Sequence, residues 1–444
     1  MPHEARVKVL FRERAGRTTA FARAGDSIAT ARNGQLVLEV VPAMSPRDEA
    51  VFLLHTAAEI EHSLMVQYLY AAWSLPDGPV RVQRWRRDIL QIAREEMAHF
   101  AAVLNVLRFV GGPLNFDRED FPYRTSFYPF PFRLERLHRA SLARYVAAEM
   151  PAQSDVDAAL MAEVRRLAEG EDGSGPVNRV GALYSRVREL LIDEHKMPDR
   201  LFRPDTADLI QARPARYRAD VGRGPLYLRT VHDRAEALAL LADVANQGEG
   251  EEEMPDSHFL TFVDIFDAWP ADDAIALDVP TDPSVGAETD SENQHFAHGL
   301  ITHPRARAWA LIFDQHYRML LAWLQHALLT PAGATADGLA LRAFDAMFVL
   351  SDVGPFLSTL PRTRDGAGRA GAPFSLPYSL AFPDLPQDRW AHHRDLIETS
   401  RRQLDDLGAA DTEIEEEITR RIIGSAAAAE SFVATQADVI EGPR

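Results

Sequence analysis

Residues Ile89–Gly112, ILQIAREEMAHFAAVLNVLRFVGG, place a Glu-x-x-His pair on a helical face that should be buried. Since Glu96 and His99 are three positions apart, their side chains lie over one turn and can reach one metal ion. A buried carboxylate is costly unless its charge is compensated, and a cation held with an imidazole would do so. The alternative is a glutamate paired with an arginine, beside a hydrogen-bonded core histidine. At about 3.6 residues per turn, the stripe consists of Ile89, Ile92, Glu96, His99, Val103, Val106 and Val110.

The preceding helix, predicted from Pro46 to about Leu75, repeats this anomaly. Its apolar stripe is interrupted by Glu61, and Tyr68 follows two turns later on the same face. This spacing suits a metal ligand with a phenol that can hydrogen-bond it, and Tyr68 is the candidate catalytic residue. Glu59 and His62 lie off this stripe and are expected at the surface or behind the ligands. The stripe consists of Leu54, Ala57, Glu61, Leu64, Tyr68 and Ala72.

A third predicted helix, about Leu134–Met150, ends with Glu149 on its apolar stripe. The alternative for an acid at a helix end before proline is an exposed side chain. A dinuclear metal site in a four-helix bundle takes a Glu from each of two helices and a Glu/His pair from each of the others. The parts of such a site that this sequence offers are Glu61, Glu96, His99 and Glu149.

Composition limits the chemistry. The chain of 444 residues has a net charge of −18, which argues against nucleic acid or an anionic membrane as the main partner. It has no cysteine, so a metal site must use Glu, Asp, His or Tyr. The charged N-terminus and the lack of an apolar run of about 18 residues predict a cytoplasmic protein without a membrane span.

The pattern of helices and breaks predicts a mainly α protein in three parts. Residues 1–44, with β-like runs at Val7–Phe11 and Gln35–Val41, form a cap; residues 45–272 form a helical bundle, and residues 273–444 form a C-terminal helical region. The aromatic crossover Phe116–Phe132 is expected to pack and to wall a pocket, although ordinary loop packing explains any one of its aromatics. In the C-terminal region, His316 is predicted to be a hydrogen-bonded core residue rather than a ligand. The further predicted helices are Val180–Glu194, Ala235–Ala245, Phe259–Phe266, Arg305–Leu329, Asp337–Leu360, Arg389–Leu407 and Thr412–Glu441.

Several motifs together resemble the ferritin-like domain family related to iminophenyl-pyruvate dimer synthase. That group includes enzymes that couple oxidised tryptophan units in violacein- and rebeccamycin-type pathways. The resemblance spans about residues 45–375, and the Glu-Glu-Met-x-His run at 95–99 is its most specific piece. It rests on Glu59-Ile60-Glu61-His62 with Tyr68-Leu69, Ile92–His99, Asn105-Val106-Leu107 with Gly111-Gly112-Pro113, Glu149-Met150-Pro151, Gln247-Gly248-Glu249-Gly250, Ser257-His258-Phe259 and Gly371-Ala372-Pro373-Phe374.

The resemblance implies a ferritin-like four-helix bundle with a metal centre, expected to be di-iron, with manganese as an alternative. Glu249 and His258 would complete the ligand set. They are nine residues apart with Pro255 between them, so they are not a Glu-x-x-His pair on one helix, and a mononuclear site is the alternative. The implied ligands are Glu61, Glu96, His99, Glu149, Glu249 and His258.

The function expected from this resemblance is oxidation of a small amino-acid-derived or aromatic substrate in secondary metabolism, with dioxygen as the oxidant. The named dimer synthases are considerably longer than this chain, so their coupling reaction is not carried over. The alternatives are a non-catalytic iron-binding protein of the same fold and a structural helical protein without metal. The C-terminal helical region would obstruct a ferritin-like shell, so a small oligomer such as a homodimer is expected.

Overall fold

The chain is mainly helical over the residues that this computed structural model describes. These are residues 31–32, 35–36, 44–118, 129–130, 132–151, 155–169, 180–203, 231–249, 257–270, 272–286, 299–331, 333–376, 380, 382–410 and 415–436. The side chains of 31–36, 249, 409 and 410 are not among the described features. The mainly α prediction is confirmed, and the predicted run Val7–Phe11 lies outside the described residues.

Two short strands precede a long series of helices along the chain. The strands, β1 (Ala31–Arg32) and β2 (Gln35–Leu36), pair in antiparallel fashion. The helices are α3 (Pro46–Trp73), α4 (Val80–Phe109), α5 (Arg139–Ala148), α6 (Ala158–Glu169), α7 (Gly181–Ile192), the 3-10 helix η1 (Asp199–Leu201), α9 (Arg234–Glu249), α10 (His258–Ala268), α12 (Pro304–Leu329), α13 (Ala334–Leu357), α14 (Pro386–Ala410) and α15 (Glu416–Ala434).

Local hydrogen bonds and a glycine conformation fix the start of α3 and the end of α4. The Ser45 hydroxyl accepts a hydrogen bond from the backbone N–H of Asp48, at 3.2 Å, and so caps α3. After α4, Gly111 takes a φ of 79°, a conformation that glycine adopts without a steric cost. The N–H of Gly112 then bonds the carbonyl of Leu107 at 2.8 Å. Both of these boundaries were predicted from the sequence.

The third predicted helix differs in position and in role. Helix α5 begins at Arg139 rather than at Leu134, because His138 caps it: its Nδ1 accepts from the N–H of Ser141, and the Ser141 hydroxyl accepts from the N–H of His138. Helix α6 was not predicted. Helix α9 continues to Glu249, beyond the predicted end at Ala245.

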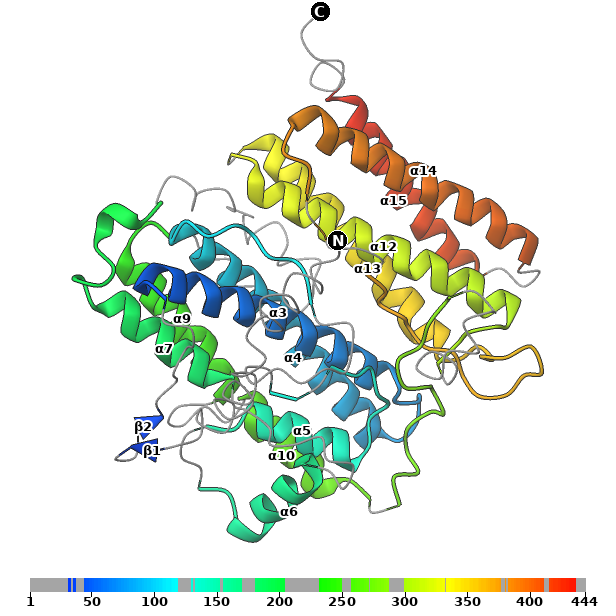
Figure 1. Ribbon diagram of the computed structural model, residues 1–444. Helices are drawn as coiled ribbons and strands as arrows, with labels where there is room; N and C mark the ends of the chain where they lie inside the picture. Colours follow the sequence, from blue (N-terminus) through cyan, green and yellow to red (C-terminus); the bar gives the residue numbers. More distant parts are fainter. Residues whose placement is uncertain are drawn as a thin grey trace, which may run out of the picture.

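Four helices, α3, α4, α7 and α9, form the bundle that was predicted. Helix α3 packs on α4 and α7, and α9 closes the ring by packing on the same two helices. Helices α5 and α10 pack on each other beside the bundle, with α10 also in contact with α4 and α9. In Figure 1 the bundle helices share one general direction, and α5, α6 and α10 lie together at one end. The third bundle helix is therefore α7, and not the helix that precedes Glu149.

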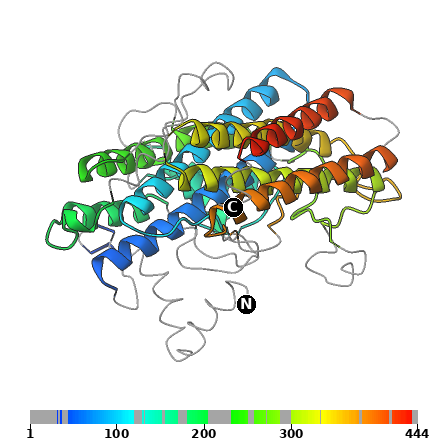
Figure 2. The ribbon, with the colours of Figure 1, turned by 90° about the horizontal axis from the view of Figure 1, so that it is seen from above.

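Helices α12–α15 form a second group alongside the bundle, drawn yellow to red in Figures 1 and 2. Helix α12 packs on α13 and α14, α15 packs on the same two helices, and α13 touches α3. One cluster of buried apolar residues runs from the bundle into α12 and α13, and a smaller one lies within α12–α15. The boundary at 272/273 stays a prediction, and the core crosses it. Among the described residues, no helix combines the length and apolar composition needed to cross a membrane.

Trp73, at the C-terminal end of α3, joins the two groups of helices. Its ring stacks on Phe374, with centroids 5.7 Å apart and planes at 4°, and meets Phe313 of α12 edge-on at 5.9 Å. Helix α13 passes the ring at Gly354, where a Cβ would lie only 2.4 Å from the indole. A glycine is therefore required for this close approach of α13 to α3.

His62 contacts the second group of helices. It is fully buried, and its Nε2 is hydrogen-bonded to the hydroxyl of Tyr317 on α12, to which Arg118 also donates at 3.2 Å. Burial, together with the charge of Arg118, lowers the pKa of His62 to about 3. The prediction that His62 could lie at the surface is wrong, because α12, which is distant in sequence, covers this face of α3.

His316 is a core histidine, as predicted. It is fully buried in α12, and its Nδ1 lies 3.0 Å from the carbonyl oxygen of Ile312 one turn earlier. Burial lowers the pKa of His316 to about 4, whereas an unfolded histidine titrates near pH 6.5. Below pH 6.5 the unfolded chain therefore binds a proton at this position that the folded chain excludes, so stability falls as the pH falls.

A His316→Leu variant should expose this pH dependence. Between pH 7.5 and pH 5.5, the free energy of unfolding of the wild type should fall by about 1.4 kcal/mol relative to the variant, which lacks the group. Urea unfolding at both pH values measures this difference. His195→Ala, at an exposed histidine, is the control. If the free energies of unfolding of the wild type and the variant differ by the same amount at both pH values, this result would contradict the lowered pKa of His316.

Candidate metal centre

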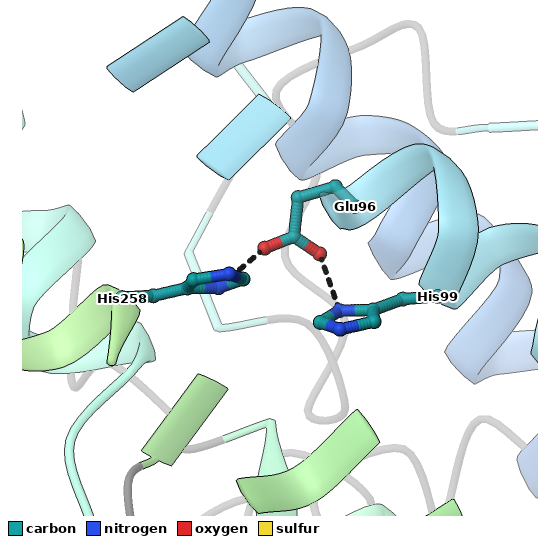
Figure 3. Close-up of side chains that lie close together, drawn as sticks. All are labelled: Glu96, His99 and His258. Atoms are coloured by element: carbon teal, nitrogen blue, oxygen red, sulfur yellow. Dashed lines mark hydrogen bonds and ion pairs between the residues drawn. The ribbon is translucent and has the colours of Figure 1, made fainter. Parts of the chain in front are cut away.

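Glu96 lies at the centre of a buried cluster of carboxylates and imidazoles. Its side chain is 1% exposed, and each of its two oxygens faces a different histidine, as Figure 3 shows. Oε2 lies 3.1 Å from Nδ1 of His99 on the same helix, and Oε1 lies 2.9 Å from Nδ1 of His258, the first residue of α10. The three residues can present ligand atoms that all lie within 4.8 Å of one another. Among the described ion pairs, those of Glu96 are with these histidines and not with an arginine, the alternative that the sequence left open.

Both imidazole rings turn Nδ1 toward Glu96 because Nε2 is engaged elsewhere. Nε2 of His99 lies 2.8 Å from Oε1 of Gln247 on α9, and Nε2 of His258 lies 2.9 Å from Oε2 of Glu95 on α4. Both partner atoms are acceptors, so each Nε2 carries the hydrogen and donates it. In the neutral imidazole that binds a metal, the lone pair of each Nδ1 would then be the one directed into the cluster.

Two further carboxylates flank the cluster in matching positions. Oε2 of Glu61 lies 3.6 Å from Nδ1 of His99, and Oε2 of Glu149 lies 3.7 Å from Nδ1 of His258. The other oxygen of each carboxylate accepts a hydrogen bond from a buried tyrosine. Tyr184 of α7 donates to Oε1 of Glu61, and Tyr68 of α3 donates to Oε1 of Glu149 at 2.5 Å. Each histidine thus has its own carboxylate and tyrosine, and Glu96 is shared.

Without metal, protons offset the concentrated negative charge. Burial, and next the Glu96 carboxylate, raise the pKa of Glu61 to about 8. Burial alone would raise the pKa of Glu96, but the hydrogen bond with Glu61 and the charges of the histidines hold it well below 4.5. Burial alone would lower the pKa of His99, but Glu96 and Glu61 raise it to about 10. The pKa of His258 is likewise raised well above 6.5 by the surrounding carboxylates, Glu96 first, against the effect of burial.

The donor set fits metal ions. The buried side-chain atoms that make no well-formed hydrogen bond in the described part of the chain include three of this cluster: Oε2 of Glu61, Oε1 of Glu96 and Nδ1 of His258. Such atoms are costly to bury without a partner, and all three face the cluster. Carboxylate oxygens and imidazole nitrogens suit iron, manganese or zinc. The charge of two divalent cations would also balance the negative charge of the four carboxylates around the two histidines, which are Glu61, Glu95, Glu96 and Glu149.

The structure brings five of the six predicted ligands together and adds three neighbours. The five are Glu61, Glu96, His99, Glu149 and His258. Glu249 ends α9, and its side chain lies outside the described residues. Tyr68, the predicted catalytic residue, contacts the ligand candidate Glu149. The neighbours that the sequence patterns did not reveal are Glu95, Tyr184 and Gln247.

The helices that supply these groups differ from the expected pattern. Glu61, Glu96 and His99 come from the bundle helices α3 and α4, whereas Glu149 follows α5 as its C-cap and His258 begins α10. The two other bundle helices direct Tyr184 and Gln247 toward the carboxylates and imidazoles. Glycine precedes Glu249 on α9, and a Cβ at Gly248 would lie 3.0 Å from Oε2 of Glu149. The small residue therefore leaves room beside a candidate ligand.

The aromatic crossover reaches α3 near this cluster. Pro129, Phe130 and Phe132 line a narrow cleft together with residues of one face of α3, which are Ile60, Ser63, Leu64 and Gln67. Phe130 also approaches Tyr145, which meets the ring of Tyr68 edge-on at 4.8 Å. The crossover therefore packs against α3, as predicted. Residues 119–128 and 131 of it lie outside the described residues.

The family comparison agrees with this architecture. Residues 54–267 match the family model described as Ferritin-like, and they contain α4, α7, α9, most of α3 and all five clustered ligand candidates. These residues form a ferritin-like domain. The resemblance inferred from the sequence motifs is confirmed.

Two curated relatives are similar to a larger share of the chain than the family model matches. The chain is 28% identical to dichlorochromopyrrolate synthase of Lentzea aerocolonigenes over 79% of its own length and 39% of that protein. It is 26% identical to 2-imino-3-(indol-3-yl)propanoate dimerase of Chromobacterium violaceum over 68% of its own length and 31% of that protein. The chain therefore spans about a third of the length of these relatives. A crystal structure of a ferritin-like protein from Caulobacter vibrioides covers 69% of this chain and 96% of its own, with a TM-score of 0.44 and 17% identity.

Proposed function

We propose that this protein is an oxidative enzyme with a dinuclear metal centre, most suitably iron, acting on a small aromatic compound derived from an amino acid. The observation that carries the proposal is the carboxylate of Glu96, which offers one oxygen to each of two histidine-carboxylate sets. A single ion held by Glu96, His99 and His258 together would leave the flanking carboxylates of Glu61 and Glu149 without a role as ligands. Two sets arranged about one shared carboxylate favour a pair of ions.

The centre consists of two half-sites in this proposal. The His99 half-site is made of His99, Glu61 and Oε2 of Glu96, and the His258 half-site is made of His258, Glu149 and Oε1 of Glu96. The tyrosines act on the flanking carboxylates. Because each tyrosine donates to Oε1, it holds that oxygen and leaves Oε2 directed toward the histidine and an ion.

Iron suits the proposed chemistry because the ligands are oxygen and nitrogen atoms and no cysteine is present. Bound in its reduced form, it would supply the electrons that dioxygen accepts during oxidation of the substrate. The residues of the chain bury the centre: Glu61, Glu96, His99, Glu149 and His258 are each at most 4% exposed. Burial excludes bulk water, which would compete for a reactive site.

The names of the relatives support the substrate class. One relative is named for an imino acid that carries an indole ring, and the rings of Phe130, Tyr145 and Tyr68 form a series of aromatic contacts that leads to the ligand candidate Glu149. We therefore propose an aromatic 2-imino acid, or a compound made from one, as the substrate class. The relatives are much longer than this chain, so their complete reactions are not assigned to it.

Metal analysis together with a turnover assay tests the proposal. Protein expressed with ample iron under reducing conditions should contain close to two iron ions per chain by elemental analysis. An L-amino-acid oxidase with L-tryptophan and catalase would supply the imino acid. Adding the iron-loaded protein should then increase dioxygen uptake and change the products, as followed by mass spectrometry.

The results of these measurements separate the candidate functions. Metal without turnover of aromatic imino acids would favour a non-catalytic iron-binding protein, and the mass of the native particle would then distinguish a cage from a small oligomer. Protein that takes up no iron, manganese or zinc would overturn the proposed centre and leave a structural helical protein.

A further inference from the structure

The two half-sites differ in the group that holds the outer nitrogen of each histidine. Nε2 of His258 donates to a carboxylate, Oε2 of Glu95, at 2.9 Å, whereas Nε2 of His99 donates to a neutral amide oxygen of Gln247 at 2.8 Å. The distances are nearly equal, so the difference is one of charge rather than of geometry. The shared carboxylate and the two tyrosine-carboxylate pairs are otherwise matched.

Glu95 is held in place for this contact. Its second oxygen, Oε1, accepts a hydrogen bond from Nε2 of Gln91 at 2.8 Å, and Oε1 of Gln91 in turn accepts from Arg94 at 3.0 Å. Both oxygens of Glu95 are therefore acceptors with assigned donors, and a rotation of its side chain would break two hydrogen bonds. This chain of contacts lies along one side of α4.

Adjacent positions on α4 serve different purposes. Successive helical residues point about 100° apart, so Glu95 and Glu96 cannot face the same point. Glu96 faces the cluster between the two histidines, and Glu95 reaches the outer edge of His258. The Glu-Glu pair thus contacts His258 at both of its ring nitrogens.

We propose that Glu95 and Gln247 are positioning residues that make the two half-sites unequal, so that the His258 half-site binds a divalent cation more tightly and fills first. This inference rests on the proposed dinuclear centre. A hydrogen bond to a carboxylate makes an imidazole a stronger electron-pair donor than a hydrogen bond to an amide does, and removing such a partner typically lowers metal affinity by about 10- to 100-fold. The two half-sites would then differ in their affinity for a divalent cation, and the His258 half-site would be occupied at the lower metal concentration.

Isothermal titration of the metal-free 444-residue chain with Mn²⁺ or Co²⁺ tests this order. The wild type should show two binding steps of different affinity. Glu95→Gln keeps an acceptor oxygen but removes the charge, and should weaken the tighter step about 10- to 100-fold. Gln247→Glu adds the missing charge and should strengthen the weaker step. Glu189→Gln, at an exposed glutamate, is the matched control and should change neither step.

Single-half-site backgrounds show which ion is affected. In His99→Ala, where the His258 half-site remains, Glu95→Gln should still weaken binding; in His258→Ala it should have no effect. A general structural role of Glu95 would weaken binding equally in both backgrounds, and would overturn the inference. Two equal steps in the wild type would also overturn it while leaving the proposed centre intact. No metal uptake by the wild type would overturn the proposed function and this inference together.

Discussion

Glu96→Gln is expected to abolish stable binding of both metal ions, the largest effect of any single substitution in the centre. The reason is that, among the described side chains, Glu96 is the one with an oxygen beside both histidines, at 3.1 Å from Nδ1 of His99 and 2.9 Å from Nδ1 of His258. An amide at this position has no negative charge and only one acceptor oxygen. Each half-site would lose a charged ligand, so affinity should fall by more than about 100-fold, beyond the effect of a residue behind the ligands.

Elemental analysis after iron loading measures this loss, and circular dichroism of the metal-free variant shows whether the helices are retained. Glu59→Gln is the matched control, because Glu59 is a glutamate of α3 only two residues from Glu61 whose carboxylate instead bonds Asn115 at 2.9 Å. It should bind metal like the wild type. A folded Glu96→Gln variant that still holds two ions per chain would refute the shared-carboxylate arrangement.

Gly354→Ala is expected to give a large loss of stability for a small change in side chain. The added Cβ would lie 2.4 to 2.6 Å from three atoms of the Trp73 ring. That ring is 4% exposed and is fixed between Phe374 and Phe313, so it cannot move aside without disturbing the contact between the two groups of helices. Overpacking of this kind typically costs about 1 to 3 kcal/mol.

The control for this prediction is the same substitution at a glycine with open space. A Cβ added to Gly424 of α15 would have no heavy atom within 4 Å, and alanine is favoured over glycine in a helix by up to about 1 kcal/mol. Gly424→Ala should therefore be neutral or stabilising in urea or thermal unfolding. Equal midpoints for the two variants would show that the close approach at Trp73 is not required.

The sequence by itself determined most of the helices and three of the candidate ligands. A Glu or His on an otherwise apolar helical stripe becomes buried whatever packs on that stripe, so Glu61, Glu96 and His99 could be identified from periodicity alone. Glu149 and His258 were weaker signals. They stand at helix ends, where an exposed side chain fits the pattern equally well, and the family resemblance was needed to include them.

Only the tertiary structure decided which residues stand behind these ligands. Tyr184 and Gln247 lie 123 residues from Glu61 and 148 residues from His99, their respective partners, and a tyrosine or glutamine on a helix carries no local mark of such a partner. The same holds for His62, which α12 buries from a distance of 255 residues. Periodicity reports only which face of a helix is buried. The identity of the group that meets that face depends on how distant helices pack, and that packing set the hydrogen-bond partner of each histidine.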